Sequence, residues 1–216
     1  MTSGRNLRLW PLLLTLAATP ATRAAEIDTE ALLARLARPA PDTTTFVEVR
    51  YSSLLAEPLV VSGDLEHRAD GSLVRRVTEP YRESTVLRGE NVTVEREGSK
   101  PRSFSLDRAP ELRGMLASFG ALLKGDRALL DRYFTLAVHG TDAKWQIELL
   151  PFDRKLARRL AAIRVDGSLD RARCFTLSEP DGDASVMAVG LQGRADLPVT
   201  LDQASLLAWC GGGAEP

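Results

Sequence analysis

Histidine and cysteine are scarce in this chain, with two residues of each among 216. His67 and His139 stand alone in the sequence, so no Cys/His cluster or His-Glu-x-x-His motif offers a transition-metal site. A Gly-x-Ser-x-Gly nucleophile motif, a phosphate-binding loop and a dinucleotide fingerprint are also missing. We therefore expect a protein that is not an enzyme and that uses no cofactor and no metal. An enzyme without these motifs would depend on His67 or His139.

Long hydrophobic runs are missing as well. The apolar segment 9–18 is too short to cross a membrane as a helix, and Pro11 interrupts it. It follows Arg5 and Arg8 and precedes small residues, which is the pattern of a secretory signal peptide. We predict that residues 1–24 are a signal peptide and that residues 25–216 form one soluble, exported domain. Because no cysteine follows the apolar run, we expect no lipid anchor.

Neither sign of charge dominates, since 28 basic residues balance 29 acidic ones and the net charge is −1. Removal of the predicted signal peptide takes Arg5, Arg8 and Arg23 with it and lowers the net charge to −4. A mildly acidic chain without a basic block is poorly suited to nucleic acid or to anionic membrane surfaces. We therefore expect the main partners to be neither nucleic acid nor an anionic membrane surface.

The two cysteines are Cys174 and Cys210. In the oxidising compartment that a signal peptide implies, we expect them to form a disulfide. Such a bond would tie the last strands to the C-terminal segment and add about 3–4 kcal/mol of stability. A redox-active pair is the alternative, but it lacks the usual Cys-x-x-Cys spacing.

The segment 107–125 predicts the main amphipathic helix. Asp107 can cap its start, Pro110 suits its first turn, and Gly125 suits the residue after its end. Its apolar residues recur at helical spacing on one face: Leu112, Met115, Leu116, Phe119, Leu122 and Leu123. The helix is either an ordinary core element or a lid over an apolar cavity. As a lid it would use Leu112, Met115, Leu116, Phe119 and Leu123.

Shorter helices are predicted near both ends and between strands. The segment 28–38 is amphipathic, is capped by Asp28 and is stopped by the prolines of segment 39–41. A second short helix follows Asp126. Residues 153–162 predict a helical crossover, and residues 201–209 predict a last short helix.

Most of the remaining chain alternates between apolar and polar residues, which is typical of β-strands. Strands are predicted at 46–51, 59–67, 73–78, 84–87, 92–95, 134–139, 145–150, 163–165, 173–177 and 185–189. Turns are predicted at 70–71, 88–91, 166–167 and 181–182. Because Asp181 and Asp183 flank a turn glycine, we interpret them as hairpin residues and not as metal ligands.

Consecutive strands joined by tight turns predict an α+β fold, with a curved antiparallel sheet that has one apolar concave side. Helices are available to cover that side, and a curved sheet covered in this way would form a cavity large enough for a lipid. The predicted cavity-lining residues are Val47, Val49, Tyr51, Leu59, Val61, Leu65, Leu73, Val77, Trp145, Ile147 and Leu149.

Several segments resemble LolA, the periplasmic carrier of outer-membrane lipoproteins. They are GDLEHRADGSLVRRVTEP at 63–80, the hairpin at 83–94 and WQIELLP at 145–151. Their order and spacing carry the match, which covers nearly the whole mature chain and points to a LolA-related subgroup. The resemblance implies an incomplete β-barrel of about eleven strands with a helical lid, and reversible binding of acyl chains.

Two positions depart from the family pattern. LolA proteins place an arginine and a proline in the turn after the GDL strand, where the arginine helps to hold the lid closed. Here Ala69 and Asp70 occupy those positions, and Arg68 comes one residue early, which reverses its side of the strand. Arg75 stands where a large apolar cavity residue is expected, and a buried arginine needs an anionic partner. It either sits at the cavity rim or meets a phosphate or carboxylate headgroup.

The sequence thus predicts a periplasmic, non-enzymatic carrier for transport in outer-membrane biogenesis. Its cargo would be an acylated lipoprotein, or a free lipid or polyene-type product. The resemblance implies an inner-membrane donor and an outer-membrane acceptor, and we expect a monomer. The alternative is an envelope assembly factor or chaperone that binds protein partners without lipid.

Overall fold

The computed structural model describes residues 27–106, 120–122 and 124–212. In this part of the chain, eleven strands form one antiparallel sheet in the order β6-β5-β4-β3-β2-β1-β11-β10-β9-β8-β7. The strands are β1 (Asp42–Tyr51), β2 (Leu59–His67), β3 (Leu73–Glu79), β4 (Glu83–Arg88), β5 (Asn91–Arg96), β6 (Arg102–Ser105), β7 (Phe134–Thr141), β8 (Lys144–Pro151), β9 (Ala162–Ser168), β10 (Arg171–Ser178) and β11 (Ala184–Val189). Because β6 and β7 do not pair with each other, the sheet stays open. The predicted α+β fold with an incomplete barrel is confirmed.

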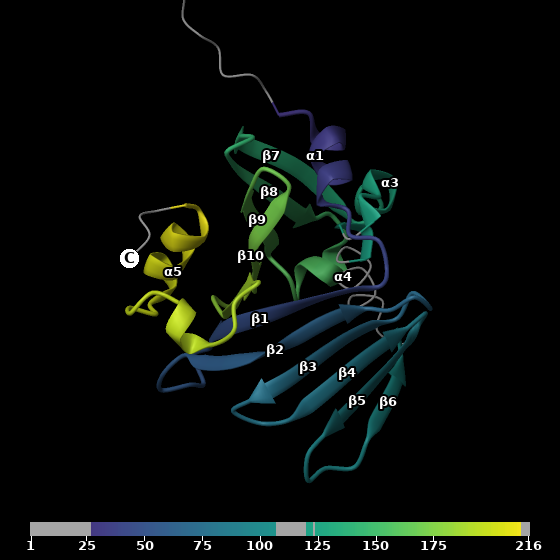
Figure 1. The fold of residues 1–216 in the computed structure, drawn as a ribbon, viewed down its shortest axis with the longest axis vertical. Helices are drawn as coiled ribbons and strands as arrows, with labels where there is room; N and C mark the ends of the chain where they lie inside the picture. Colours follow the sequence, from purple (N-terminus) through teal and green to yellow (C-terminus); the bar gives the residue numbers. More distant parts are fainter. Residues whose placement is uncertain (1–26, 107–119, 123, 213–216) are drawn as a thin grey trace, which may run out of the picture.

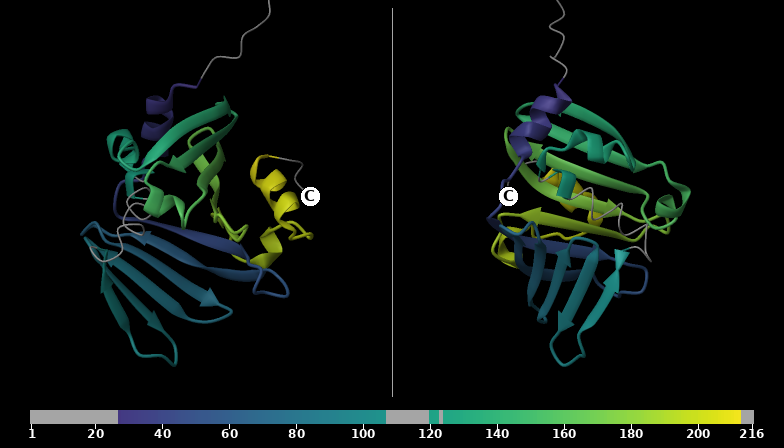
Figure 2. Two further views of the ribbon diagram at one scale, coloured as in Figure 1. Left: turned by 180° about the vertical axis from the view of Figure 1, so that it is seen from behind. Right: turned by 90° about the vertical axis from the view of Figure 1, so that its right-hand side faces the viewer.

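The helices cover the two faces of the sheet unequally (Figure 1). They are α1 (Thr29–Leu36), α3 (Arg127–Leu130), α4 (Arg154–Ala157), the 3-10 turn η2 (Arg194–Asp196) and α5 (Gln203–Cys210). Figure 2 shows the sheet bent, with α1, α3 and α4 on the side toward which its ends curve and α5 behind it. No helix among the described residues is long and apolar enough to cross a membrane.

Cross-strand partners point to the same face of a sheet, so the register assigns each strand residue to one of two faces. We call the face that carries Phe46, Val61 and Ile147 the inner face, and the face that carries Val47 and Val49 the outer face. The inner face is the concave one, on the side of α1, α3 and α4. The outer face packs against α5.

Two of the predicted helix caps, Asp28 and Asp126, are confirmed. Asp28 accepts hydrogen bonds from the backbone N–H groups of Glu30 and Ala31 and starts α1. Asp126 caps α3 through the N–H of Leu129 at 3.0 Å. Of the predicted helix 107–125, residues 107–119 and 123 lie outside the described residues. The described end, with Ala121 and Leu122 buried, is helical and stops at a glycine with positive φ.

Three details differ from the prediction. Segment 153–162 is no crossover, because it joins two antiparallel neighbours, β8 and β9, and only α4 within it is helical. β6 is an additional strand, too short and polar for its alternation to be visible. Asp166 and Gly167 form no turn but lie inside β9, where Gly167 faces Trp145. A Cβ atom at Gly167 would come within 2.3 Å of the Trp145 ring, so this position needs glycine.

The predicted disulfide is confirmed. Cys174 of β10 and Cys210 at the end of α5 are bonded, with their Cα atoms 5.6 Å apart. The bond lies on the outer face within a cluster that also contains Val47, Val49 and Trp209. It fastens the C-terminal helix to the back of the central strands.

Candidate functional site on the inner face

The register aligns apolar side chains across the whole inner face. In the middle of the sheet, Phe175, Met187 and Val61 lie on neighbouring strands, with Glu48 between the last two. Toward the β6 edge, Leu73, Leu87, Val92 and Phe104 form one continuous cross-strand row. The inner face is therefore largely a hydrophobic surface, as the sequence predicts, with a charged group near its centre.

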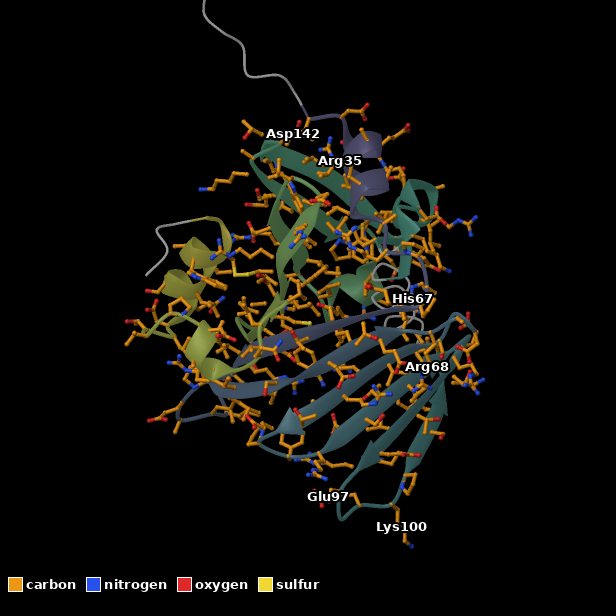
Figure 3. All side chains as sticks on the ribbon, viewed as in Figure 1. Arg35, His67, Arg68, Glu97, Lys100 and Asp142 are labelled. Atoms are coloured by element: carbon orange, nitrogen blue, oxygen red, sulfur yellow. A yellow bond between two sulfur atoms is a disulfide. The ribbon has the colours of Figure 1, made fainter. Side chains whose placement is uncertain are left out.

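We call β7–β10 the filled half of the sheet. Its inner face packs against α1, α3, α4 and the short helical piece at Ala121 and Leu122. Trp145, Ile147 and Leu149 of β8 have at most 2 % of their surface exposed. Arg35 of α1 and Asp142 of the β7–β8 turn pair at 2.7 Å, and they lie next to each other at the top of Figure 3. This half is an ordinary packed core.

We call β1–β6 the open half. Its inner-face residues Leu59, Leu65, Leu73 and Leu87 are only half-buried, and Phe104 is 40 % exposed. Val61, Val77 and Phe46 form a small buried cluster at the boundary toward the filled half. The open half thus presents apolar side chains that the rest of the described chain does not fully cover.

The predicted cavity residues divide between the two faces and the two halves. Those in the open half and on its inner face are Leu59, Val61, Leu65, Leu73 and Val77. Trp145, Ile147 and Leu149 share this face but belong to the filled half. The placement of Val47, Val49 and Tyr51 on the cavity side is wrong. They lie on the outer face, where they pack with the α5 segment, and the Tyr51 hydroxyl donates to the Leu201 carbonyl at 3.0 Å.

A cluster of three charged side chains lies near the centre of the inner face: Glu48 and Arg50 of β1, and Arg75 of β3. Other charged residues share this face on β4 and β5, among them Glu83 and Arg96. Arg50 donates to Glu48 through Nε at 2.9 Å and through Nη2 at 3.2 Å. Arg75 donates to Glu48 Oε2 through its own Nη2. Its guanidinium carbon also lies 4.8 Å from the centre of the Phe46 ring, within the range of a cation–π contact. One carboxylate therefore serves two guanidinium groups.

Glu48 is held in its ionised form. Burial raises the pKa of this carboxyl, but the hydrogen bonds and charges of Arg50 and Arg75 outweigh it and leave the pKa below its ordinary value. For Arg50, burial lowers the pKa and the Glu48 pair raises it, with a net increase. The group therefore consists of one anion and two cations, with one excess positive charge among these three.

Arg68, the other residue predicted to bind a headgroup or latch the lid, pairs with a residue of the outer face instead. Its Nε lies 3.1 Å from Glu66, an outer-face residue that also binds Arg76 at 2.7 Å. Figure 3 shows His67 and Arg68 at the right-hand end of β2. His67 is buried, with Nδ1 3.4 Å from the Arg38 carbonyl, and His139 is exposed on edge strand β7.

Two further features of the described chain lie away from the hydrophobic surface. A hollow of about 310 Å³ lies between the β1–β2 and β10–β11 turns, where Asp183 accepts hydrogen bonds from Ser52 and Ser53. Another of about 680 Å³ lies at the polar end of β3–β5. No cluster of three or more His, Cys, Asp or Glu residues suited to a metal occurs in the described segments. The lid residues Leu112, Met115, Leu116, Phe119 and Leu123 lie outside those segments.

Sequence reasoning missed Glu48 and Arg50 as site residues. Alternation separates the two faces of β1 but does not show which face is the inner one. Because Val47, Val49 and Tyr51 are apolar, the sequence predicts them on the inner face, but they lie on the outer face. Arg75 could have revealed this cluster from the sequence, because a charged residue that points inward requires an oppositely charged partner on a nearby strand. Glu48 supplies that partner on β1, two strands away from β3.

Comparisons with known proteins identify the family. A family model described as "Outer membrane lipoprotein carrier protein LolA-like" matches residues 21–212. No curated protein matches in sequence. A LolA superfamily protein, NE2245 of Nitrosomonas europaea, is 14 % identical, with 80 % of this chain and 96 % of that chain covered and a TM-score of 0.39.

Two other solved structures are similar at the same level. LprF of Mycobacterium bovis is 12 % identical, with 81 % of this chain and 96 % of that chain covered and a TM-score of 0.34. MucB in the MucA/MucB complex of Pseudomonas aeruginosa is 15 % identical, with 76 % of this chain and 56 % of that chain covered and a TM-score of 0.39. The assignment therefore depends on the family model.

Proposed function

Because the chain belongs to the LolA-like family of outer membrane lipoprotein carrier proteins, we propose that it carries acyl chains on the inner face of its open half. The observation that supports this most directly is the row Leu73, Leu87, Val92 and Phe104. It is continuous across four strands and ends in an exposed aromatic ring. Val92 within the row is buried, but Leu73 and Leu87 are only half-buried and Phe104 is exposed. A contiguous apolar surface that stays partly exposed is a mark of an interaction site.

The energetics suit a carrier. Each buried methylene contributes about 0.8 kcal/mol, so a long acyl chain gains on the order of 10 kcal/mol on such a surface. A binding site made of side-chain contacts alone needs no catalytic group and no cofactor. We therefore propose a non-enzymatic role.

The carrier would act in the periplasm after export. Its cargo would be an acylated lipoprotein or a lipid, received from an inner-membrane donor and delivered toward the outer membrane. Each transfer of cargo would depend on the difference in binding free energy between the hydrophobic sites of two proteins, because apolar contacts are not directional. Neither the donor nor the acceptor has to be recognised through a specific hydrogen-bond pattern on the inner face.

A second candidate function is an envelope factor that binds a protein by strand addition. β6 stands at one end of the strand order in the described part of the chain, and edge strands are templates for added strands. The short length and polar composition of β6 make it a weaker site than the apolar row beside it.

Two neighbouring residues of β4 provide the test. Leu87 lies on the inner face opposite Leu73 and Val92, whereas Val86 lies on the outer face opposite Val74 and Thr93. Both are half-buried. The mature protein and the variants Leu87→Glu and Val86→Glu would be purified from the periplasm, extracted with organic solvent and analysed for lipids by mass spectrometry.

We expect stoichiometric acyl lipid with the wild type and with Val86→Glu, and loss of that lipid with Leu87→Glu. A folded wild-type protein that carries no lipid, and that binds none when offered it, would contradict the carrier function. It would favour the protein-binding alternative. Equal loss in both variants would show that a general disturbance of β4 is responsible.

A further inference from the structure

We propose that Arg75 binds the anionic group of the ligand, so that the open half selects acidic amphiphiles over neutral ones with the same acyl chain. This inference rests on the proposed acyl-binding function and specifies its ligand class. The relevant class is an acyl chain that ends in a carboxylate or a phosphate.

Arg75 has hydrogen-bonding capacity left over. A guanidinium group carries five N–H donors. Of these, Arg75 uses only one on Nη2 toward Glu48 within the described part of the chain. Its side chain is 21 % exposed, while that of Glu48 is 7 % exposed. Arg75 therefore keeps N–H donors that no group in the described part of the chain uses, and they are reachable from outside.

The positive charge of the Glu48, Arg50 and Arg75 cluster is also not fully neutralised among these three residues. Glu48 binds Arg50 through two hydrogen bonds and Arg75 through one, so it is engaged more fully with Arg50. Arg50 has a further favourable interaction with the charge of Glu83. One carboxylate thus faces two guanidinium groups, and an added anion would balance the remaining positive charge of this cluster.

The position of Arg75 suits the head of an amphiphile. On the inner face of β3 it stands between Leu73 and Val77, each one two-residue step away, or roughly 7 Å along the strand. An acyl chain lying along the row that begins at Leu73 would have its acidic group beside the guanidinium. Phe46, under the guanidinium, keeps that end of the site partly apolar and so strengthens the charge interaction.

The adjacent residue Arg76 supplies a matched control. It is an arginine on the same strand but on the outer face, where it pairs with Asp64 and Glu66 at 2.7 Å each. Arg75→Met and Arg76→Met remove the same charge from the chain and leave side chains of similar length. Any effect of net charge alone is therefore common to both variants.

The experiment measures the affinity of the delipidated mature protein for three probes with the same chain: hexadecanoate, hexadecyl phosphate and methyl hexadecanoate. We expect the wild type to prefer the acidic probes over the ester by about tenfold or more, the range of one charge-assisted hydrogen-bond pair. Arg75→Met should abolish this preference and leave ester binding within about twofold. Arg76→Met should keep it. The two acidic probes distinguish carboxylate from phosphate recognition.

A second variant tests the same idea from the other side. Glu48→Gln removes the resident anion, so it should tighten binding of the acidic probes and leave the ester unchanged. This measurement decides the question if Arg75→Met does not fold. Urea unfolding of each variant shows which ones are folded.

Several outcomes would overturn the inference. Equal affinity of the wild type for acidic and neutral probes would do so, as would equal losses in Arg75→Met and Arg76→Met, or weaker acidic binding in Glu48→Gln. If the ester binds but no preference exists, the acyl-carrier function stands and only the role of Arg75 fails. If none of the three probes binds, both proposals fail.

Discussion

The filled and open halves use the same sheet for different purposes. In β7–β10 the inner face is covered by α1, α3 and α4, and Trp145, Ile147 and Leu149 are buried as in any core. In β1–β6 the leucines of this face are only half-buried and Phe104 is exposed, and the boundary carries Glu48 with two arginines. Burial of the first half stabilises the fold, while incomplete burial of the second leaves hydrophobic free energy available for a ligand.

In the proposed carrier, this division would allow one domain to be stable and also able to bind cargo. A fully covered inner face would leave no surface for cargo, and a fully uncovered one would expose a large apolar patch to water. On the inner face, α1, α3 and α4 pack on the filled half, so packing of the core would not compete with binding in the open half. Each of the following predictions tests whether the halves really differ in this way.

The largest expected effect concerns the aromatic residues of the inner face. Trp145→Ala should lower the free energy of unfolding by about 3–5 kcal/mol, because it leaves a cavity in the filled half and removes the hydrogen bond to the Leu169 carbonyl. Phe104→Ala in the open half should cost about 1 kcal/mol or less, since the ring is already 40 % exposed. Urea unfolding followed by circular dichroism measures both. Similar losses would remove the distinction between the halves.

The disulfide provides the next largest effect and separates stability from binding. Replacing Cys174 and Cys210 together with alanine should cost about 2–4 kcal/mol, because the unfolded chain regains the freedom of a long loop. Since the bond lies on the outer face, lipid content should stay the same at temperatures where the variant is folded. Mass spectrometry of the co-purified lipid checks this. Loss of lipid from a folded variant would mean that the outer face controls the inner one.

The smallest effect concerns acid pH. The pKa of Glu48 is lowered from 4.5 in the folded state, so its stabilising contribution is present above that pH and lost as the pH falls below it. Burial raises the pKa of Asp166 on the outer face from 3.8, so that carboxyl gives the opposite trend: the fold gains stability as the pH falls. The free energy of unfolding should therefore decline less steeply below about pH 5 in Glu48→Gln and more steeply in Asp166→Asn. Unchanged slopes in both variants would contradict these charge assignments.

Much of the fold is visible in the sequence because period and capping are local signals. β2 lies at the predicted residues, and Asp28 and Asp126 cap the helices that follow them. The Asp166-Gly167 turn fails for a tertiary reason. A glycine after an aspartate normally signals a turn, but this one makes room for an indole ring on the next strand.

The candidate site is harder to read, since β1 is buried on both faces. Val47 and Val49 look like a cavity face, yet helix α5 from the far end of the chain covers them. Glu48 and Arg50 look like a solvated face, yet they point to the concave side and meet Arg75. Alternation identifies the two faces of a strand, but long-range packing decides what each one contacts.

The Cys174–Cys210 bond also determines which part of the sheet is able to deform. It holds α5 against β10, and α5 packs on β1 and β11, so the central strands are braced from behind. Within the described segments, β3–β6 have no such brace. Cargo molecules of different size would therefore change the curvature of β3–β6 and leave the strands that α5 contacts in place. We therefore expect β3–β6 to be the more deformable part of the described sheet and the strands in front of α5 to be the stiffer part.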